Sequence, residues 1–400
     1  MDVIVGGGVV GLSVAWRLAR EGRPVTVVDP APASGASHAA AGMLAPVSEV
    51  TYTEAPLLRL GVAALRRWPA FAAALAEDAA LPPAGPEGVS GLDLRAEGTL
   101  DVAFGADDMA ALDELAAFME KLDLPVERLT GRECRRLEPM LAPSVRGGLL
   151  APGDAWVNPR RVTAALLAAL ERRGVPIVRA RVSELVRTDG AVTGVRLAEP
   201  PAEPPAEPPA GPAEGRGSAP LAATDGRAGD EVLAAERVVL AAGAWSGELA
   251  EVPVRPVKGQ IMRLRSPQPL LTRCVRGTVH GSPVYLVPRG DGELVVGATQ
   301  EELGYDTRVT AGGLYELLRD ARELVPGVTE LEVADVVAGL RPGTPDNLPV
   351  IGPGRTPGLT YATGHHRGGV LMAPLTAAIL MGEESELAAL CSPGRFREIS

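Results

Sequence analysis

The chain has 400 residues, of which 46% are hydrophobic and 22% charged, a balance typical of soluble globular proteins with two or three domains. Its net charge of -11 disfavours nucleic acid and anionic membrane surfaces as partners, and aromatic residues amount to only 3%. Three scattered cysteines without a CxxC pair argue against a zinc site or disulfide framework, and favour a reducing, cytoplasmic setting. The apolar N-terminus carries Asp2, Arg17 and Arg20, so we expect neither a signal peptide nor a membrane-spanning helix there.

The first 29 residues predict a β-α-β unit. Residues 2–5 are an apolar, β-branched run typical of a buried parallel strand. Residues 9–20 follow as an Ala/Leu-rich helix that ends at Gly22, and residues 24–28 predict a second buried strand.

Glycines in the first turn match the GxGxxG pattern, at Gly6, Gly8 and Gly11. In this pattern one glycine permits the tight turn, one lets the backbone approach a pyrophosphate, and one lets the helix pack on the strand. Asp29 ends the second strand, where a carboxylate can accept hydrogen bonds from both ribose hydroxyls. The context predicts a dinucleotide site that would suit NAD or FAD, and a glycine-rich turn without a ligand is the alternative.

The next segments predict mostly helices. Residues 54–80 indicate one or two helices, broken near Pro69, and residues 107–122 indicate another. A further helix should begin after Asn158, a plausible N-cap, with Pro159 at its first position, and should end at Gly174. Two short strands are expected at 175–182 and 192–197.

Residues 199–230 begin with three successive EPPA repeats and continue as a Gly/Ala/Asp-rich stretch. Proline removes backbone donors, and few large apolar side chains are available, so this segment cannot form a packed core. We predict a flexible, solvated insertion at a hairpin tip. A ligand for a proline-recognising partner is the alternative.

The C-terminal half predicts a mixture of strands and two helices. A strand beginning at 236 runs into a small-residue turn, and three segments suggest antiparallel strands, at 254–264, 284–288 and 294–299. Helices are expected at 312–325 and about 370–382, the second of which follows a strand at 359–362.

Three further motifs could carry chemistry. The small residues from Ser37 to Pro46 let the backbone lie flat against a bulky group, or form only a tight loop. Arg341 stands beside Pro/Gly turns that suit bidentate binding of a carboxylate, although an isolated arginine is more often structural. Residues 364–369 form a strand-to-helix junction whose backbone donors could stabilise negative charge on a cofactor ring. His365 and His366 have no third ligand at useful spacing, so we expect no metal.

Together these motifs resemble the D-amino-acid-oxidase family of FAD enzymes, and most closely its glycine-oxidising members. The resemblance runs from Val3 to about Met381 and excludes 199–230. The most specific matches keep their order and spacing, at 39–46, 256–260, 285–289, 294–299, 339–352 and 364–374.

The resemblance implies a two-domain α/β fold. A Rossmann-like FAD-binding domain with a central parallel sheet would comprise 1–50, 145–250 and 330–400. A substrate-binding cap built on an antiparallel sheet would comprise 51–144 and 251–329. The family also implies a homo-oligomer, in its usual form a tetramer.

The resemblance further implies non-covalent FAD and assigns residues to it. The glycine turn would lie under the pyrophosphate, Asp29 would bind the adenosine ribose, and the backbone of Val182 would contact the adenine. The cofactor-binding residues would be Gly6, Gly8, Val9, Val10, Gly11, Asp29, Pro30, Ser37, Ala41, Gly42, Met43, Val182, Gly364, His365, His366, Arg367, Gly368, Gly369, Val370 and Leu371.

By the same resemblance Arg341 would pair with the substrate carboxylate, with support from Tyr285, and Arg367 and Met43 would lie beside the substrate. No side chain is required as acid or base if the amine binds neutral. The implied reaction is oxidative deamination of glycine, sarcosine or D-alanine with O2, which yields imine or glyoxylate, ammonia and H2O2 and serves thiamine thiazole synthesis. His366 and Gly368 depart from the commonest family residues, which leaves the substrate range open.

Several alternatives stay open at this point. Within the fold these are a broader D-amino-acid oxidase, a quinone-linked D-amino-acid dehydrogenase and a sarcosine oxidase with covalent flavin. In other classes they are an NAD-dependent dehydrogenase and a binding module that uses the EPPA repeats. Lys258 could be an oxygen-activating charge or a structural ion-pair residue.

Overall fold

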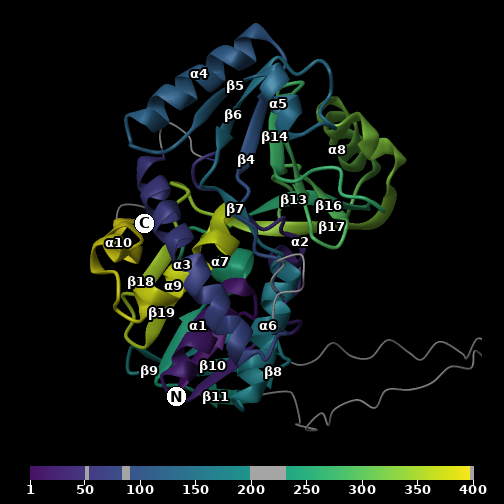
Figure 1. Cartoon of the computed structure of the whole chain (residues 1–400). Coiled ribbons are helices and arrows are strands. Elements are labelled where there is room, and N and C mark those ends of the chain that lie inside the picture. Colours follow the sequence, from purple (N-terminus) through teal and green to yellow (C-terminus); the bar gives the residue numbers. More distant parts are fainter. Residues whose placement is uncertain (50–53, 83–90, 199–230, 397–400) are drawn as a thin grey trace, which may run out of the picture.

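The computed structural model describes residues 1–49, 54–82, 91–198 and 231–396. Figure 1 shows a lower part built around a parallel sheet and an upper part built around a mainly antiparallel sheet. This arrangement confirms the predicted fold class. The predicted insertion at 199–230 lies outside the described residues, but the strands on either side of it, β10 (Ala191–Leu197) and β11 (Val232–Ala234), pair antiparallel.

The parallel sheet has six strands in the order β18-β19-β12-β1-β2-β8. Only the pairing of β18 with β19 is antiparallel. The central strands consist of short β-branched runs, which is the pattern of a strand buried on both faces. Their bounds are β1 Asp2–Val5, β2 Val25–Val28, β8 Ile177–Val178, β12 Arg237–Leu240, β18 Val350–Pro353 and β19 Leu359–Thr363.

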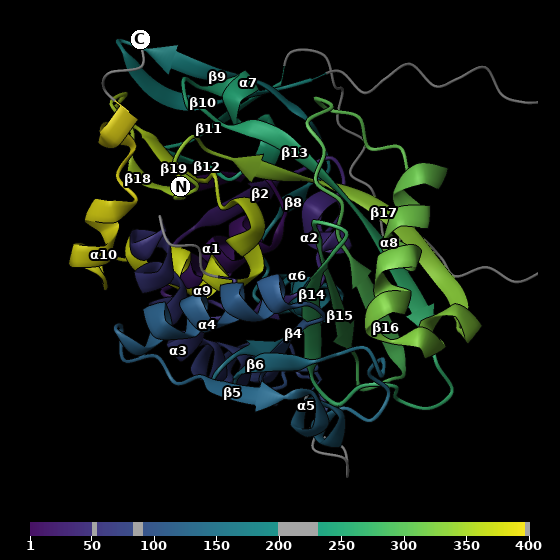
Figure 2. The same ribbon diagram turned by 90° about the horizontal axis from the view of Figure 1, so that it is seen from above.

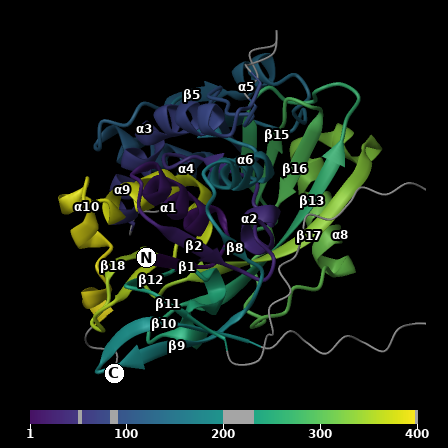
Figure 3. The same cartoon turned by 90° about the horizontal axis from the view of Figure 1, so that it is seen from below.

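The two faces of this sheet are covered differently, because successive side chains of a strand point to opposite sides. Ile4 packs among four helices, whereas Val3 and Val5 pack against the small sheet of β9 (Val182–Thr188), β10 and β11. Figure 3 shows α1 beside α9 on the helical side. The four helices are α1 Val9–Arg20, α3 Ala55–Asp78, α6 Pro159–Arg172 and α9 Gly369–Leu380.

Helix α3 corrects one prediction, because it runs unbroken through Pro69. Proline inside a helix costs about 3 kcal/mol. Trp68 and Phe71 lie on either side of Pro69 and are buried in one core with Leu60 and Leu75. Each such side chain contributes about 1.5–3 kcal/mol on burial, so packing offsets the lost helical hydrogen bond. The predicted cap of α6 is confirmed, since Asn158 Oδ1 accepts hydrogen bonds from Arg160 N and Arg161 N.

The second large sheet has eight strands in the order β17-β13-β16-β15-β14-β4-β6-β5. All neighbours are antiparallel except β14 and β4, which are parallel. The three strands expected near 254–264, 284–288 and 294–299 all belong to it. Its strands are β4 Thr99–Ala103, β5 Glu127–Thr130, β6 Gly147–Ala151, β13 Arg255–Arg265, β14 Cys274–Val279, β15 Ser282–Pro288, β16 Glu293–Gly297 and β17 Glu332–Gly343.

Alternation along these strands decides which side chains face the parallel sheet. Met262 and Leu286 pack in the cluster that contains α8 (Ala311–Leu324), which covers one face of the sheet (Figure 2). Their neighbours Ile261 and Tyr285 therefore point to the other face, where they pack with Met43. The smaller strands and α-helices are β3 Met43–Leu44, β7 Ala155–Trp156, α2 Gly35–Ala39, α4 Ala106–Glu120, α5 Gly131–Leu137, α7 Ser246–Leu249 and α10 Ser385–Leu390, and short 3-10 helices cover Gly243–Trp245, Pro326–Glu330, His366–Gly368 and Pro393–Phe396.

None of the helices that the structure describes combines the length and apolarity needed to span a bilayer. The domain boundaries given above remain a proposal. Strands β6 and β17 belong to the eight-stranded sheet although they lie in segments assigned to the FAD-binding domain, so the chain passes between the two sheets more often than the boundaries imply.

Candidate functional site

One cavity of about 970 Å³ is lined by residues from the glycine turn, from the eight-stranded sheet and from the start of α9. Its size lies at the upper end of the usual range for ligand sites, roughly 300–1,000 Å³. Most of the predicted site residues line it, namely Gly8, Val9, Val10, Ser37, Ala41, Gly42, Met43, Tyr285, Arg341, His365, His366, Arg367, Gly369 and Val370. The other predicted residues are not in its lining, namely Gly6, Gly11, Asp29, Pro30, Val182, Gly364, Gly368 and Leu371.

The glycine turn leaves backbone open to this cavity. At Gly6, which has a φ of +112°, a Cβ would lie 2.3 Å from Ala241 O, and at Gly11 it would lie 2.0 Å from Gly6 O. These two glycines are therefore required for packing. At Gly8 a Cβ would instead enter the cavity, with only Ser37 Oγ nearby at 3.2 Å. Such a cradle at a helix N-terminus suits the phosphates of a dinucleotide.

Asp29 lies at the carboxyl end of β2, beside the same turn. Its carboxylate accepts hydrogen bonds from Gly7 N at 2.6 Å and Ala31 N at 2.7 Å. These bonds fix the side chain against the glycine turn, but the carboxylate does not line the cavity. The assignment of Asp29 to the ribose remains a prediction.

Arg341 lies on strand β17, opposite Val257 of β13, and not in the turn that its Pro/Gly surroundings suggested. Its guanidinium lies flat on Gly259, where a Cβ would stand 2.4 Å from both terminal nitrogens. Nη1 donates hydrogen bonds to Thr299 O at 3.2 Å and Lys258 O at 3.4 Å. Among the described residues no carboxylate forms an ion pair with Arg341, so the cavity contains a half-buried cation with free donors.

Tyr285 stands on β15 beside this cation. Its ring lies over Gly297, where a Cβ would be 2.5 Å from the hydroxyl, and the register pairs the two residues across β15 and β16. Burial raises the pKa of Tyr285 to about 12, although the positive charge of Arg341 lowers it. The hydroxyl therefore stays protonated at physiological pH and can donate a hydrogen bond.

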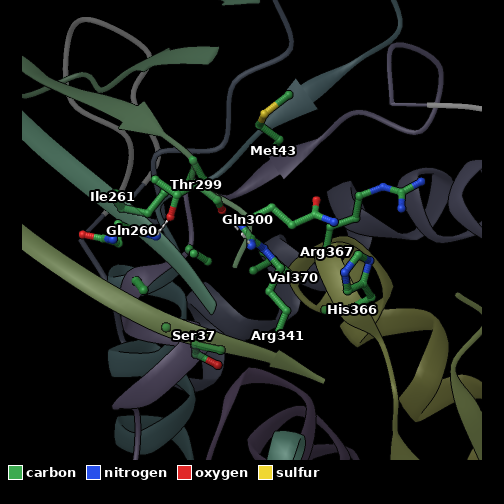
Figure 4. A pocket seen from close by; sticks show the side chains of 18 of the residues that line it. Ser37, Met43, Gln260, Ile261, Thr299, Gln300, Arg341, His366, Arg367 and Val370 are labelled. Carbon is green, nitrogen blue, oxygen red and sulfur yellow. Dashed lines mark hydrogen bonds between the residues drawn. The ribbon is translucent and has the colours of Figure 1, made fainter. Parts of the chain in front are cut away.

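Arg367 also lines the cavity, but its guanidinium has partners of its own. It forms an ion pair with Glu54 and donates a hydrogen bond to Glu49 O at 3.3 Å. Figure 4 shows the side chain pointing away from Arg341, with Gln300 extending between the two arginines. Asn347 Nδ2 holds the same Glu54 carboxylate at 2.7 Å. A direct contact of Arg367 with a substrate remains a prediction.

The two histidines at the start of α9 are neutral at physiological pH. Burial lowers the pKa of His365 to about 3, and its Nε2 forms a hydrogen bond with Thr376 Oγ1 at 2.8 Å. Burial and the nearby charges of Arg367 and Arg341 lower the pKa of His366 to about 4. His366 also adopts a φ of +47°. This backbone turn places both residues at the cavity wall.

Several residues at the site were not predicted from the sequence. Gln260, Thr299 and Glu301 line the cavity and share a hydrogen-bond network, in which Gln260 Nε2 donates to Glu301 Oε1 at 2.8 Å. Lys258, for which the sequence left an oxygen-activating charge or a structural ion pair open, is not in the cavity lining; it is fully buried and pairs with Glu301 at 3.4 Å and Asp306 at 3.7 Å. The segment 256–260 carried part of the family resemblance, which was the available signal for these positions.

Comparisons with known proteins found a matching family model and several similar proteins. A family model described as FAD dependent oxidoreductase (DAO) matches residues 3–382. Glycine oxidase from Geobacillus kaustophilus is 32% identical, and the alignment covers 94% of this chain and 90% of that protein. The crystal structure of glycine oxidase from the same organism superposes with a TM-score of 0.78 and 31% identity over 96% of this chain and 94% of that one.

A longer relative also matches. The bifunctional protein ThiO/ThiG of Nostoc sp. strain PCC 7120 is 32% identical over 94% of this chain but only 51% of its own length. The chain thus spans about half the length of the first curated relatives that it matches.

Proposed function

This chain belongs to the family of FAD dependent oxidoreductases, and from that premise we propose that it oxidises the amine of glycine and other small amino acids such as sarcosine or D-alanine. In this proposal O2 accepts the electrons, and the products are imine or glyoxylate, ammonia and H2O2. A link of the product to thiamine thiazole synthesis is part of the same proposal. The relatives named glycine oxidase support it.

The observation that carries the proposal is the guanidinium of Arg341. It lies in the cavity on Gly259, beside the Tyr285 ring, and no carboxylate of the described chain neutralises it. A half-buried guanidinium with free donors binds a carboxylate in bidentate geometry. The hydroxyl of Tyr285 offers a further donor to the same carboxylate.

The residues of the cavity fit FAD. Gly8 and the N-terminus of α1 would hold the pyrophosphate, with Ser37 beside them, while the segment from His365 to Val370 would lie along the flavin ring. When bound, FAD supplies the acceptor for the hydride of the substrate. The free N–H groups at the start of α9 favour negative charge near that end of the cavity.

Positioning is the main work of the protein side chains in this proposal. Arg341 and Tyr285 hold the carboxylate and thereby fix the direction of the α-carbon. A pKa lowered to about 4 makes His366 a weak proton acceptor, and the hydroxyl of Tyr285 stays protonated, so neither is suited to hold a proton taken from the substrate at neutral pH. The amine therefore has to lose its proton before the α-hydrogen leaves.

Replacement of Arg341 tests the proposal. We expect the purified chain to carry visible flavin absorption and to release peroxide with glycine. Arg341→Ala should keep the flavin but raise KM for glycine at least a hundredfold, since it removes a charge-assisted bidentate contact. Arg308→Ala, which removes an arginine at the surface, is the control. Unchanged glycine kinetics in Arg341→Ala would refute the assigned role.

A panel of glycine, sarcosine, D-alanine and larger D-amino acids, read by peroxide release, separates the proposal from a broader D-amino-acid oxidase. Flavin reduction without peroxide, followed by reoxidation with a quinone, would indicate a dehydrogenase instead. Yellow colour that stays on acid-precipitated protein would show covalent flavin.

A further inference from the structure

Glu49 places a second charge on the cavity wall, opposite in sign to Arg341. The residue is half-buried and lines both the main cavity and a small neighbouring one. Within the described chain its carboxylate accepts no hydrogen bond and forms no ion pair. A carboxylate that is partly removed from water and has no partner is available to a ligand.

The backbone that carries Glu49 is held from several sides. The buried Asp154 accepts hydrogen bonds from Val47 N at 3.2 Å and Ser48 N at 3.1 Å. Arg276 Nη1 donates to Ser48 O at 2.6 Å, and Arg367 Nη2 donates to Glu49 O at 3.3 Å. These bonds leave the backbone at residues 47–49 little freedom, so the point from which the Glu49 side chain extends at the cavity wall is fixed.

The two opposite charges line the same cavity as Tyr285. Besides burial, the pKa of Tyr285 is lowered by the charge of Arg341 and raised by that of Glu49, so both groups are near the ring. Arg276 also lines the cavity, and its charge is close enough for Glu49 to raise its pKa, but its ion pair is with Asp101, whose carboxylate lies 3.2 Å from its Nε. Arg341 and Glu49 therefore remain a cation and an anion that line one cavity without an ion-pair partner among the residues the structure describes.

The other acidic residues of the cavity wall do not offer the same feature. Glu301 is engaged by Lys258, Gln260 and Thr299. Asp320 is paired with Arg319, and Glu316 is exposed on α8. Glu49 is thus distinguished by being both half-buried and unpaired within the described chain.

We propose that Glu49 is a specificity-determining residue, which pairs with the ammonium group of an amino acid whose carboxylate is held by Arg341, and which disfavours substrates that carry a second negative charge. This inference rests on the proposed function and deepens it. A zwitterion matches both charges, whereas a simple carboxylate matches only Arg341. An acidic side chain would meet like charge at Glu49, which costs affinity.

Glu49→Gln keeps the size of the side chain and removes its charge. We expect KM for glycine to rise about tenfold, because a partly exposed ion pair is lost. The inhibition constant of acetate, which has no ammonium group, should stay unchanged or fall. The ratio of kcat/KM for D-aspartate to that for D-alanine should rise. Glu316→Gln removes one negative charge from the same wall and should change none of these quantities.

The flavin spectrum of each variant checks that the cavity is intact. An unchanged KM for glycine in Glu49→Gln, or an equal weakening of glycine and acetate, would overturn the inference. Failure of the wild-type chain to oxidise any small amino acid would instead overturn the proposed function. The two failures are therefore distinguishable in one set of measurements.

Discussion

A single glycine on strand β13 determines where the cation of the site lies. Gly259 has no side chain, and the guanidinium of Arg341 occupies the space that a Cβ would fill. Gly259→Ala should therefore displace Arg341 and raise KM for glycine at least tenfold, while flavin binding persists. Gly312→Ala is a matched control, because Gly312 also lines the cavity but has open space around its Cβ position.

The measurement is steady-state peroxide release over a range of glycine concentrations. If Gly259→Ala and Gly312→Ala had the same KM for glycine, the guanidinium of Arg341 could bind the carboxylate from another position. The prediction that its contact with Gly259 is required for substrate binding would then be wrong.

At the residue scale, sequence motifs located Arg341 and Tyr285, and both line the cavity. They did not reveal that Arg367 is paired, because Glu54 lies 313 positions away in the chain. Glu49 was missed for a related reason. Its place at the wall depends on Asp154 and Arg276, which no local pattern connects to residues 47–49.

At the scale of elements, the segment around residues 47–49 depends on a buried carboxylate. Burial raises the pKa of Asp154 to about 6, although backbone N–H groups of Ser48 and Val47 partly oppose this. The folded chain therefore binds the proton of Asp154 more tightly than the unfolded chain does. As pH rises from about 4 to about 6, ionisation of this group should remove up to about 3 kcal/mol of stability.

The free energy of unfolding of Asp154→Asn and of the wild type, measured over a range of pH, tests this predicted loss of stability. The stability of the wild type relative to the variant should fall as pH rises from about 4 to 6 and then level off. Asp346→Asn should show the opposite pH dependence, since the neighbouring Arg395 lowers the pKa of the exposed Asp346 although partial desolvation opposes this. There the relative stability of the wild type should increase with pH. A flat difference for Asp154→Asn would contradict the raised pKa.

Hydrophobic periodicity predicted the helices and strands that depend on their own sequence pattern. It did not predict a strand whose formation depends on pairing with a distant strand. The strands and helix of the opening β-α-β unit lie within a residue of prediction. Strand β17 was not predicted, because Pro342 and the flanking glycines favour a turn. It exists through pairing along β13, from Arg255 with Gly343 to Arg265 with Glu332. Likewise, tertiary packing on both sides of Pro69 keeps α3 continuous.

At the scale of the whole molecule, the cavity joins parts that are far apart in the chain. Its lining runs from Gly8 to Val370 and includes both large sheets. The fold class was predictable because motifs at both ends match one family. The cavity itself could not be predicted from the sequence, because its shape depends on how the two large sheets pack against each other.

A ligand that contacts several walls of this cavity should increase the free energy of unfolding of the whole chain. FAD at a hundred times its Kd adds about 2.7 kcal/mol, which for a chain of this length raises Tm by about 3 °C. Gly8→Ala directs a methyl group into the cavity, and only Ser37 Oγ lies close to it, at 3.2 Å. The variant should therefore melt like the wild-type apoprotein but lose most of the shift on addition of FAD. Thermal unfolding of both proteins, with and without FAD, measures this. An equal shift in both would mean that the phosphates do not lie on the glycine turn, because only the contact at Gly8 differs between the two chains.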